Sequence, residues 1–106
     1  MRNRKSYPTL VKKLTTLCEG WLVGSSALPD NHDPRDWDVF IPFSNWSNAC
    51  GIIPSDSKLN SFGGFKCMSD EKEVDVWTGS FEELLTSAHF KYAYHPKTNT
   101  YITKNT

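Results

Sequence analysis

A short strand-like stretch, residues 36–41, with polar and apolar residues alternating over 36–39, constrains the fold of this 106-residue chain more than any other feature. Side chains of a β-strand point alternately to opposite faces, so Asp36 and Asp38 share one face. The other face carries Trp37, Val39 and Ile41. A shift of one residue in strand pairing would bury both carboxylates and expose the three apolar groups. The pattern therefore predicts a strand of fixed register with two carboxylates displayed.

The two displayed carboxylates favour a bound cation. Side by side, Asp36 and Asp38 repel each other, and each raises the pKa of its neighbour unless a positive charge lies between them. Hard oxygen ligands at this spacing suit Mg²⁺ or Mn²⁺, which keep several waters and recruit phosphate oxygens. We therefore expect a divalent cation site on this strand.

A third carboxylate lies in a similar setting later in the chain. Asp75 stands between Val74 and Val76, so it is predicted to face away from the core while the valines face into it. If its strand lies beside the strand of Asp36 and Asp38, three carboxylates converge. Such a group can hold two cations, the arrangement that serves in-line phosphoryl displacement.

A Gly-Ser pair supplies the complementary part of the pattern. Gly24 and Ser25 directly follow a predicted buried strand over residues 21–23. Glycine lets backbone N–H groups approach a phosphate closely, and a serine hydroxyl adds another donor. The order is a strand with Gly-Ser, about a dozen residues, Asp-x-Asp, and then a later apolar-Asp-apolar strand.

This order and spacing resemble the nucleotidyltransferase superfamily that includes DNA polymerase beta. The resemblance rests on Leu-Val-Gly-Ser at 22–25, Asp-Trp-Asp-Val-Phe at 36–40 and Val-Asp-Val at 74–76. It implies that Asp36 and Asp38 ligate two metal ions, and that Asp75 ligates one and helps to activate an attacking hydroxyl. It also implies that Gly24 and Ser25 hold the β- and γ-phosphates of a nucleoside triphosphate.

The resemblance implies two alternative functions for this chain. By the resemblance, the chain transfers a nucleoside monophosphate from a triphosphate to an acceptor hydroxyl and releases pyrophosphate, with Mg²⁺ or Mn²⁺ as cofactor. Most active members carry an added helical domain, which is not recognisable here, and some minimal members act as antitoxins paired with a helical partner. The alternative is therefore a weakly active or inactive module that regulates a partner protein.

Two basic residues are candidates for triphosphate binding. Lys66 is predicted on the strand that pairs with that of Asp75, where it could reach a triphosphate or remain a solvated lysine. Arg35 directly precedes the acidic strand, where it could neutralise phosphate or pair with Asp33. Trp77, on the face of Asp75, is a candidate for stacking on a base.

The pattern of elements predicts an α+β fold, a small mixed sheet with helices packed against it, in one domain over residues 1–106. Helices are expected at 10–18, 44–50 and 81–90, the last opened by a capping box of Ser80 and Glu83 with Phe81, Leu84, Leu85 and Ala88 inward. Strands are expected at 21–23, 36–41, 65–68, 74–77, 92–94 and 101–103.

Charge, apolar content and cysteine content bear on the binding partners and on the cellular location of the chain. The formal net charge is zero and no run of like charges occurs, so strong non-specific nucleic-acid binding is not expected. No segment is long and apolar enough for a membrane span, and three unpaired-looking cysteines suggest reduced thiols in the cytoplasm. Tyr92, Tyr94, Tyr101 and Ile102 lie close together near the C-terminal segment, where we expect an exposed apolar patch that contacts a protein partner or a second copy.

Overall fold

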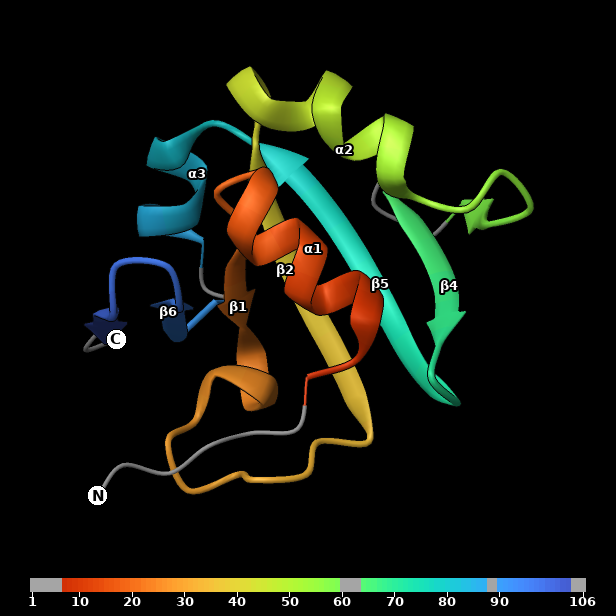
Figure 1. The fold of residues 1–106 in the computed structure, drawn as a ribbon. Helices are drawn as coiled ribbons and strands as arrows, with labels where there is room; N and C mark the ends of the chain where they lie inside the picture. Colours follow the sequence, from red (N-terminus) through yellow and green to blue (C-terminus); the bar gives the residue numbers. More distant parts are fainter. Residues whose placement is uncertain (1–6, 60–63, 88–89, 104–106) are drawn as a thin grey trace.

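The computed structural model describes residues 7–59, 64–87 and 90–103. Its elements are α1 (Thr9–Leu17), β1 (Trp21–Val23), a 3₁₀ turn (Gly24–Ala27), β2 (Asp36–Pro42), a second 3₁₀ turn (Phe43–Asn45), α2 (Trp46–Ile52), β3 (Lys58–Leu59), β4 (Phe65–Ser69), β5 (Lys72–Gly79), α3 (Phe81–Thr86), β6 (Tyr92–His95) and β7 (Thr100–Thr103). The predicted α+β class is confirmed (Figure 1).

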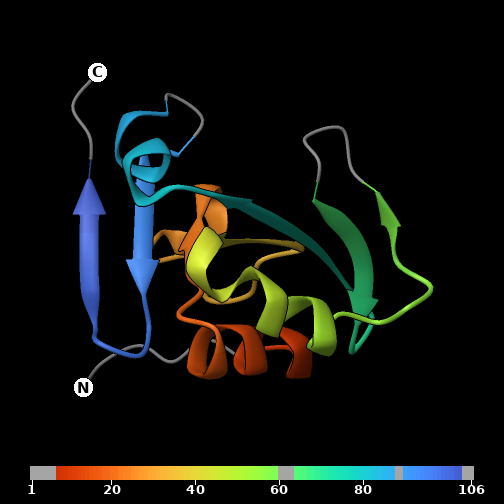
Figure 2. The same ribbon diagram turned by 90° about the horizontal axis from the view of Figure 1, so that it is seen from above.

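In the described part of the chain, seven strands form one mixed sheet in the order β3-β4-β5-β2-β1-β6-β7. Neighbouring strands run antiparallel except at the centre, where β2 and β5 are parallel from the pair Asp36–Glu73 to the pair Pro42–Gly79. Helices α1 and α2 lie against one face of the sheet, and the short α3 lies on the opposite side (Figure 2). We call these the helical face and the α3 face.

The main core lies between the sheet and the two helices of the helical face. The apolar residues of the alternating strand are buried there, with Trp37 1% exposed and Val39 and Ile41 fully buried. Val74 and Val76 are also fully buried in this core, as predicted for the neighbours of Asp75. The predicted register of both central strands is therefore confirmed.

A smaller core on the α3 face holds β1 and β2 against α3 and β6. Its buried members are Trp21, Val23, Phe40, Leu84 and Ala93. Leu84 is the buried residue of α3, whereas Phe81 and Leu85 are 46% and 42% exposed. The expectation that Phe81 and Leu85 point inward is wrong. In a helix shorter than two turns, only one side chain faces the sheet directly.

Two predicted helices have different bounds in the structure. The segment expected at 44–50 begins as a 3₁₀ turn, and α2 then runs over Trp46–Ile52 with Gly51 inside it rather than after it. Ser44 makes no capping bond; its hydroxyl donates to the Asn45 side chain instead. The helix opened by Ser80 has its capping box but ends at Thr86, because Ser87 is extended. Ala88, predicted inward, lies outside the described residues.

The N-terminus of α1 is capped from a distant turn. The preceding Pro8 offers no side-chain acceptor, and the first free N–H groups are instead bound by the β4–β5 turn. Asp70 Oδ2 accepts from the Thr9 backbone N–H at 2.7 Å and from the Thr9 hydroxyl at 3.0 Å, while Ser69 Oγ accepts from the Leu10 N–H at 3.0 Å. A carboxylate at this end of a helix also complements the helix dipole.

We expect Asp70→Gly to lower the free energy of unfolding by about 1 kcal/mol, the usual cost of a lost N-cap. Glycine suits this position because Asp70 has φ 52°, so the turn itself is preserved. The control is Glu71→Gly, also at positive φ (68°), which removes a carboxylate that no described contact joins to α1. Urea denaturation measures both; equal losses in the two variants would contradict the distant cap.

Candidate functional site

The parallel pairing of β2 and β5 brings two predicted carboxylates face to face. Asp38 pairs in register with Asp75, and Asp36 with Glu73 one step before it. All four side chains project from the α3 face, since the alternate residues of both strands are buried on the helical face. Neighbouring strands are about 4.8 Å apart, so Asp38 and Asp75 face each other across one strand spacing.

The loop after β1 lies directly against Asp38. Gly24 has φ +67°, a conformation that other residues rarely adopt, and a Cβ placed there would lie 3.3 Å from Asp38 Oδ2. Glycine therefore serves two purposes at this position: it permits the turn and leaves space beside the carboxylate. An anion resting on this loop would be so close to Asp38 that it requires a cation between them.

Ser26 fastens that loop to the acidic strand. Its hydroxyl is fully buried, donates to the Val23 carbonyl at 3.0 Å and accepts from the Asp38 backbone N–H at 3.3 Å. The Tyr101 hydroxyl on β7 donates to the Ala27 carbonyl at the other end of the turn. Ser26 therefore fixes the position of the Asp38 backbone relative to this loop.

Burial and neighbouring negative charges disfavour the ionised form of the Asp38 carboxyl. Desolvation is the largest cause that raises the pKa of its carboxyl to about 6, followed by the negative charges of Asp75 and Asp36. The Trp77 indole N–H and the Lys66 ammonium act in the opposite direction. Asp38 is therefore held where a cation would be more favourable than solvent, as expected of a functional carboxylate.

The raised pKa of Asp38 predicts a specific pH dependence of stability in protein freed of metal by a chelator. Between pH about 4 and 6 the folded state holds a proton that the unfolded state has released, so stability falls as pH rises through this window. Asp38→Asn removes that loss. We expect the variant to match the wild type near pH 4 and to exceed it above pH 6 by on the order of 1 to 2 kcal/mol, after discounting for solvent screening.

Denaturation midpoints at pH 4 to 7 test this, with Asp30→Asn, which removes a carboxylate from an exposed loop, as the control. A difference in stability between Asp38→Asn and wild type that stays constant across this pH range would contradict the raised pKa of Asp38.

The carboxylates of Asp36, Asp38 and Asp75 suit a hard divalent cation that the protein encloses only in part. Among the described residues, no three Asp, Glu, His or Cys side chains stand close enough together to hold one metal ion as they are placed. The site offers the facing pair Asp38 and Asp75, with the exposed Asp36 beside them. Mg²⁺ commonly takes one or two carboxylates and completes its shell with water and substrate phosphate, which matches this arrangement.

The other predicted ligands are distributed around this pair. Lys66 pairs with Asp75 from β4 and has its ammonium 3.8 Å from Glu73, so it lies on the same face. Ser25 is exposed, and its carbonyl accepts from the Asn31 side chain at 3.0 Å. Arg35 is exposed immediately before Asp36.

The alternative partner of Arg35, Asp33, is already engaged by another residue. The Lys72 ammonium donates to Asp33 Oδ1 at 3.0 Å and to the Pro34 carbonyl at 3.4 Å. Lys72 thereby fastens the loop that leads into β2, which leaves Arg35 as the basic group next to the acidic strand.

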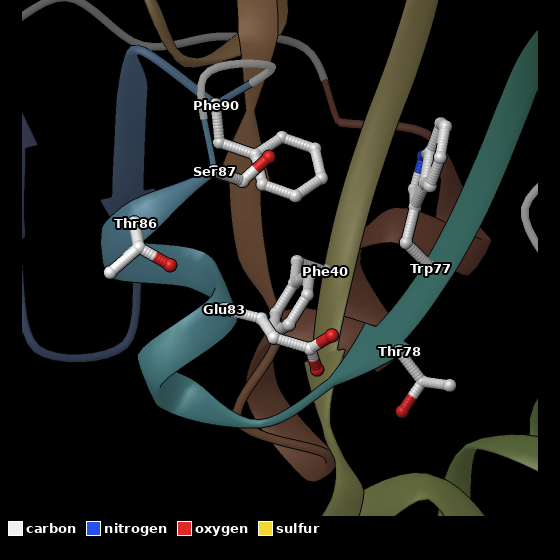
Figure 3. A pocket seen from close by; sticks show the side chains of 7 residues that line it. All are labelled: Phe40, Trp77, Thr78, Glu83, Thr86, Ser87 and Phe90. Carbon is white, nitrogen blue, oxygen red and sulfur yellow. The ribbon is translucent and has the colours of Figure 1, made fainter.

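A cavity that the sequence did not reveal adjoins the carboxylates. Its volume is about 250 Å³, and Figure 3 shows the side chains of the seven residues around it: Phe40, Trp77, Thr78, Glu83, Thr86, Ser87 and Phe90. Phe40 follows Asp38 by two residues and Trp77 follows Asp75 by two, so both continue the acidic face along their strands. Sequence reasoning singled out Trp77 alone, because the α3 contributors become neighbours only in the fold.

Comparisons with protein-family models, with curated proteins and with solved structures found no match to this chain. None of the helices in the described residues has the length and apolar character needed to cross a membrane.

Proposed function

We propose that this domain is a metal-dependent nucleotidyltransferase, which transfers a nucleoside monophosphate from a nucleoside triphosphate to an acceptor hydroxyl. The observation that carries the proposal is the in-register pair Asp38 and Asp75 on parallel strands, with the Gly24 loop against Asp38. The resemblance of the Gly-Ser, Asp-x-Asp and third-Asp order to the nucleotidyltransferase superfamily, carried by the same residues, also supports the proposal.

The proposed chemistry needs a positive charge between carboxylates and phosphates. Mg²⁺ bound here would neutralise the acidic pair and withdraw charge from the phosphoryl group under attack. The Gly24–Ser25 backbone and the Ser25 hydroxyl would hold the terminal phosphates, with Lys66 as a further cationic contact. The Asp75 carboxylate would accept the proton of the attacking hydroxyl, and the leaving group would depart as pyrophosphate.

Ligand-linked stability tests whether the site assembles. With Mg²⁺ or Mn²⁺ and a nucleoside triphosphate at ten times the dissociation constant, binding adds about 1.4 kcal/mol to the stability of the folded state. For a chain of this size we expect a rise in melting temperature of roughly 5 to 10 °C. Asp38→Asn should lose most of that rise, whereas Asp30→Asn, an exposed loop carboxylate, should keep it.

Transfer itself is tested with triphosphates labelled at the α-phosphate, offered together with RNA, protein or small-molecule fractions as acceptors. We expect label transfer with pyrophosphate release, slowed at least about 100-fold in Asp75→Asn because a general base contributes that much or more. The absence of any metal-dependent thermal shift, even with triphosphate at millimolar levels, would contradict the proposal.

A second candidate function is partner binding through β7, an edge strand of the described sheet. Its unpaired edge is a template for another chain, and nearby Tyr92 and Tyr101 are 36% and 39% exposed. Tyr94 and Tyr101 add a ring pair with centroids 5.1 Å apart. This surface favours a regulatory module that docks with a second chain, as the tyrosine pattern of the sequence predicts.

The self-association form of this second function predicts a concentration-dependent dimer in light scattering. Tyr92→Ser should weaken the dimer at least tenfold, because it removes an exposed ring without touching the Tyr101 contact to the Gly24–Ala27 turn. Leu59→Ser, at the opposite edge of the sheet and 74% exposed, is the matched control. A wild type that stays monomeric throughout contradicts self-association.

A further inference from the structure

The cavity one side-chain repeat beyond the acidic pair has the position, size and chemistry of a site for one planar ring system. We propose that it binds the nucleobase of the triphosphate, and that it selects bases with an exocyclic amino group over uracil and thymine. This inference rests on the proposed function for the orientation of the phosphates, whereas the residues that line the cavity do not include Asp38 or Asp75.

Its position follows from the alternation of β2 and β5. Phe40 and Trp77 project from the same face as Asp38 and Asp75, one side-chain repeat farther along each strand. Two residues of a strand advance about 6.6 Å, which is comparable to the span of the ribose that joins a base to its first phosphate. A nucleotide with its phosphates at the acidic pair therefore places its base in the cavity.

Three aromatic side chains line the cavity: Phe40, Trp77 and Phe90. The rings of Phe40 and Phe90 have centroids 5.7 Å apart at 66°, and those of Trp77 and Phe90 are 5.9 Å apart at 82°. Because these rings meet edge to face, they are not stacked flat upon one another (Figure 3). A planar ligand can stack on one ring and meet the edges of the others, a mode that every base can use.

Its size limits the ligand to a single ring system. The cavity measures about 250 Å³, below the usual range of roughly 300 to 1,000 Å³ for pockets that enclose a whole drug-sized molecule. The sugar and phosphates of a nucleotide therefore lie outside it, on the open acidic face.

Its polar rim presents acceptors. The Thr86 hydroxyl donates to the Glu82 carbonyl at 2.9 Å, so its oxygen keeps a lone pair for a ligand. The Glu83 carboxylate accepts one bond, from the Ser80 N–H at 2.7 Å, and a carboxylate has about four acceptor positions.

A rim of acceptors matches ring edges that donate. Adenine, guanine and cytosine carry an amino group, whereas the N3–H donor of uracil and thymine is flanked by two ring carbonyls that would meet the Glu83 carboxylate. The negative charge of Glu83 also repels phosphate, which favours entry with the base first and leaves the phosphates at the Gly24 loop.

The experiment uses nucleosides, which carry no phosphate and need no metal. Adenosine and uridine are titrated into protein held with a chelator, and the indole N–H signals of the tryptophans are followed by NMR. We expect adenosine to shift the Trp77 signal saturably and uridine to require at least about tenfold higher concentration. Trp46, which stacks on Phe65 in the core of the helical face, provides the signal that should not move.

Two variants make the expectation specific. Trp77→Leu should weaken adenosine binding about fivefold or more, read from the remaining backbone signals, because it removes a stacking surface. Glu83→Gln keeps an oxygen for the Ser80 N–H but directs an amide donor into the rim, so it should abolish the preference for adenosine over uridine. Glu82→Gln, on the exposed side of α3, is its matched control.

The outcomes separate this inference from the proposed function. Mg²⁺ with inorganic tripolyphosphate tests the acidic site without any base. A stabilising shift there, together with equal binding of adenosine and uridine or an unchanged preference in Glu83→Gln, overturns the base site alone. Adenosine selectivity without a tripolyphosphate shift upholds the cavity and contradicts the transferase. Glu83→Gln retains the helix cap, so it tests the proposed base site even if Trp77→Leu fails to fold.

Discussion

The parallel pairing of β2 with β5 is the contact on which the rest of this molecule depends. It places Asp38 opposite Asp75, and its register follows from apolar side chains on the reverse side, not from the carboxylates. Trp37 and Val39 from one strand and Val74 and Val76 from the other are almost wholly buried beneath α1 and α2. A slip of one residue would exchange these groups with the carboxylates, which hydrophobic burial and charge desolvation both oppose.

The same pairing creates an electrostatic cost that the fold has to offset. Asp38 lies near two other carboxylates and is partly desolvated, so its ionised form is disfavoured. The favourable terms come from elsewhere: the core on the helical face, the distant cap of α1 by Asp70, and the Ser26 bonds that hold the loop to Asp38. Strain concentrated at one carboxylate, with support distributed around it, is typical of sites that wait for a ligand.

The sequence predicts the strands and the face of each carboxylate well, because alternation is a local property. It does not predict that β2 and β5 are direct parallel neighbours, since strand order depends on tertiary packing and α2, β3 and β4 lie between these strands in the sequence. The cap of α1 was likewise hidden, because Asp70 lies 61 residues from Thr9. The bounds of α2 and α3 were missed for a different reason: short helices take their ends from tertiary packing more than from propensity.

The cavity could not be predicted from sequence because its residues carry other local signals. Glu83 reads as the second half of a capping box, which it is, with its Oε1 bound to the Ser80 N–H. Its carboxylate can approach the end of β5 only because residue 79 is glycine, where a Cβ would lie 2.5 Å from Glu83 Oε1 and 3.2 Å from the Phe40 ring. Gly79 thus brings α3 close enough to Phe40 and Trp77 to close the cavity. The Glu83 carboxylate therefore both caps α3 and forms part of the rim of the cavity. Only a substitution that keeps the cap can reveal what this carboxylate does at the rim.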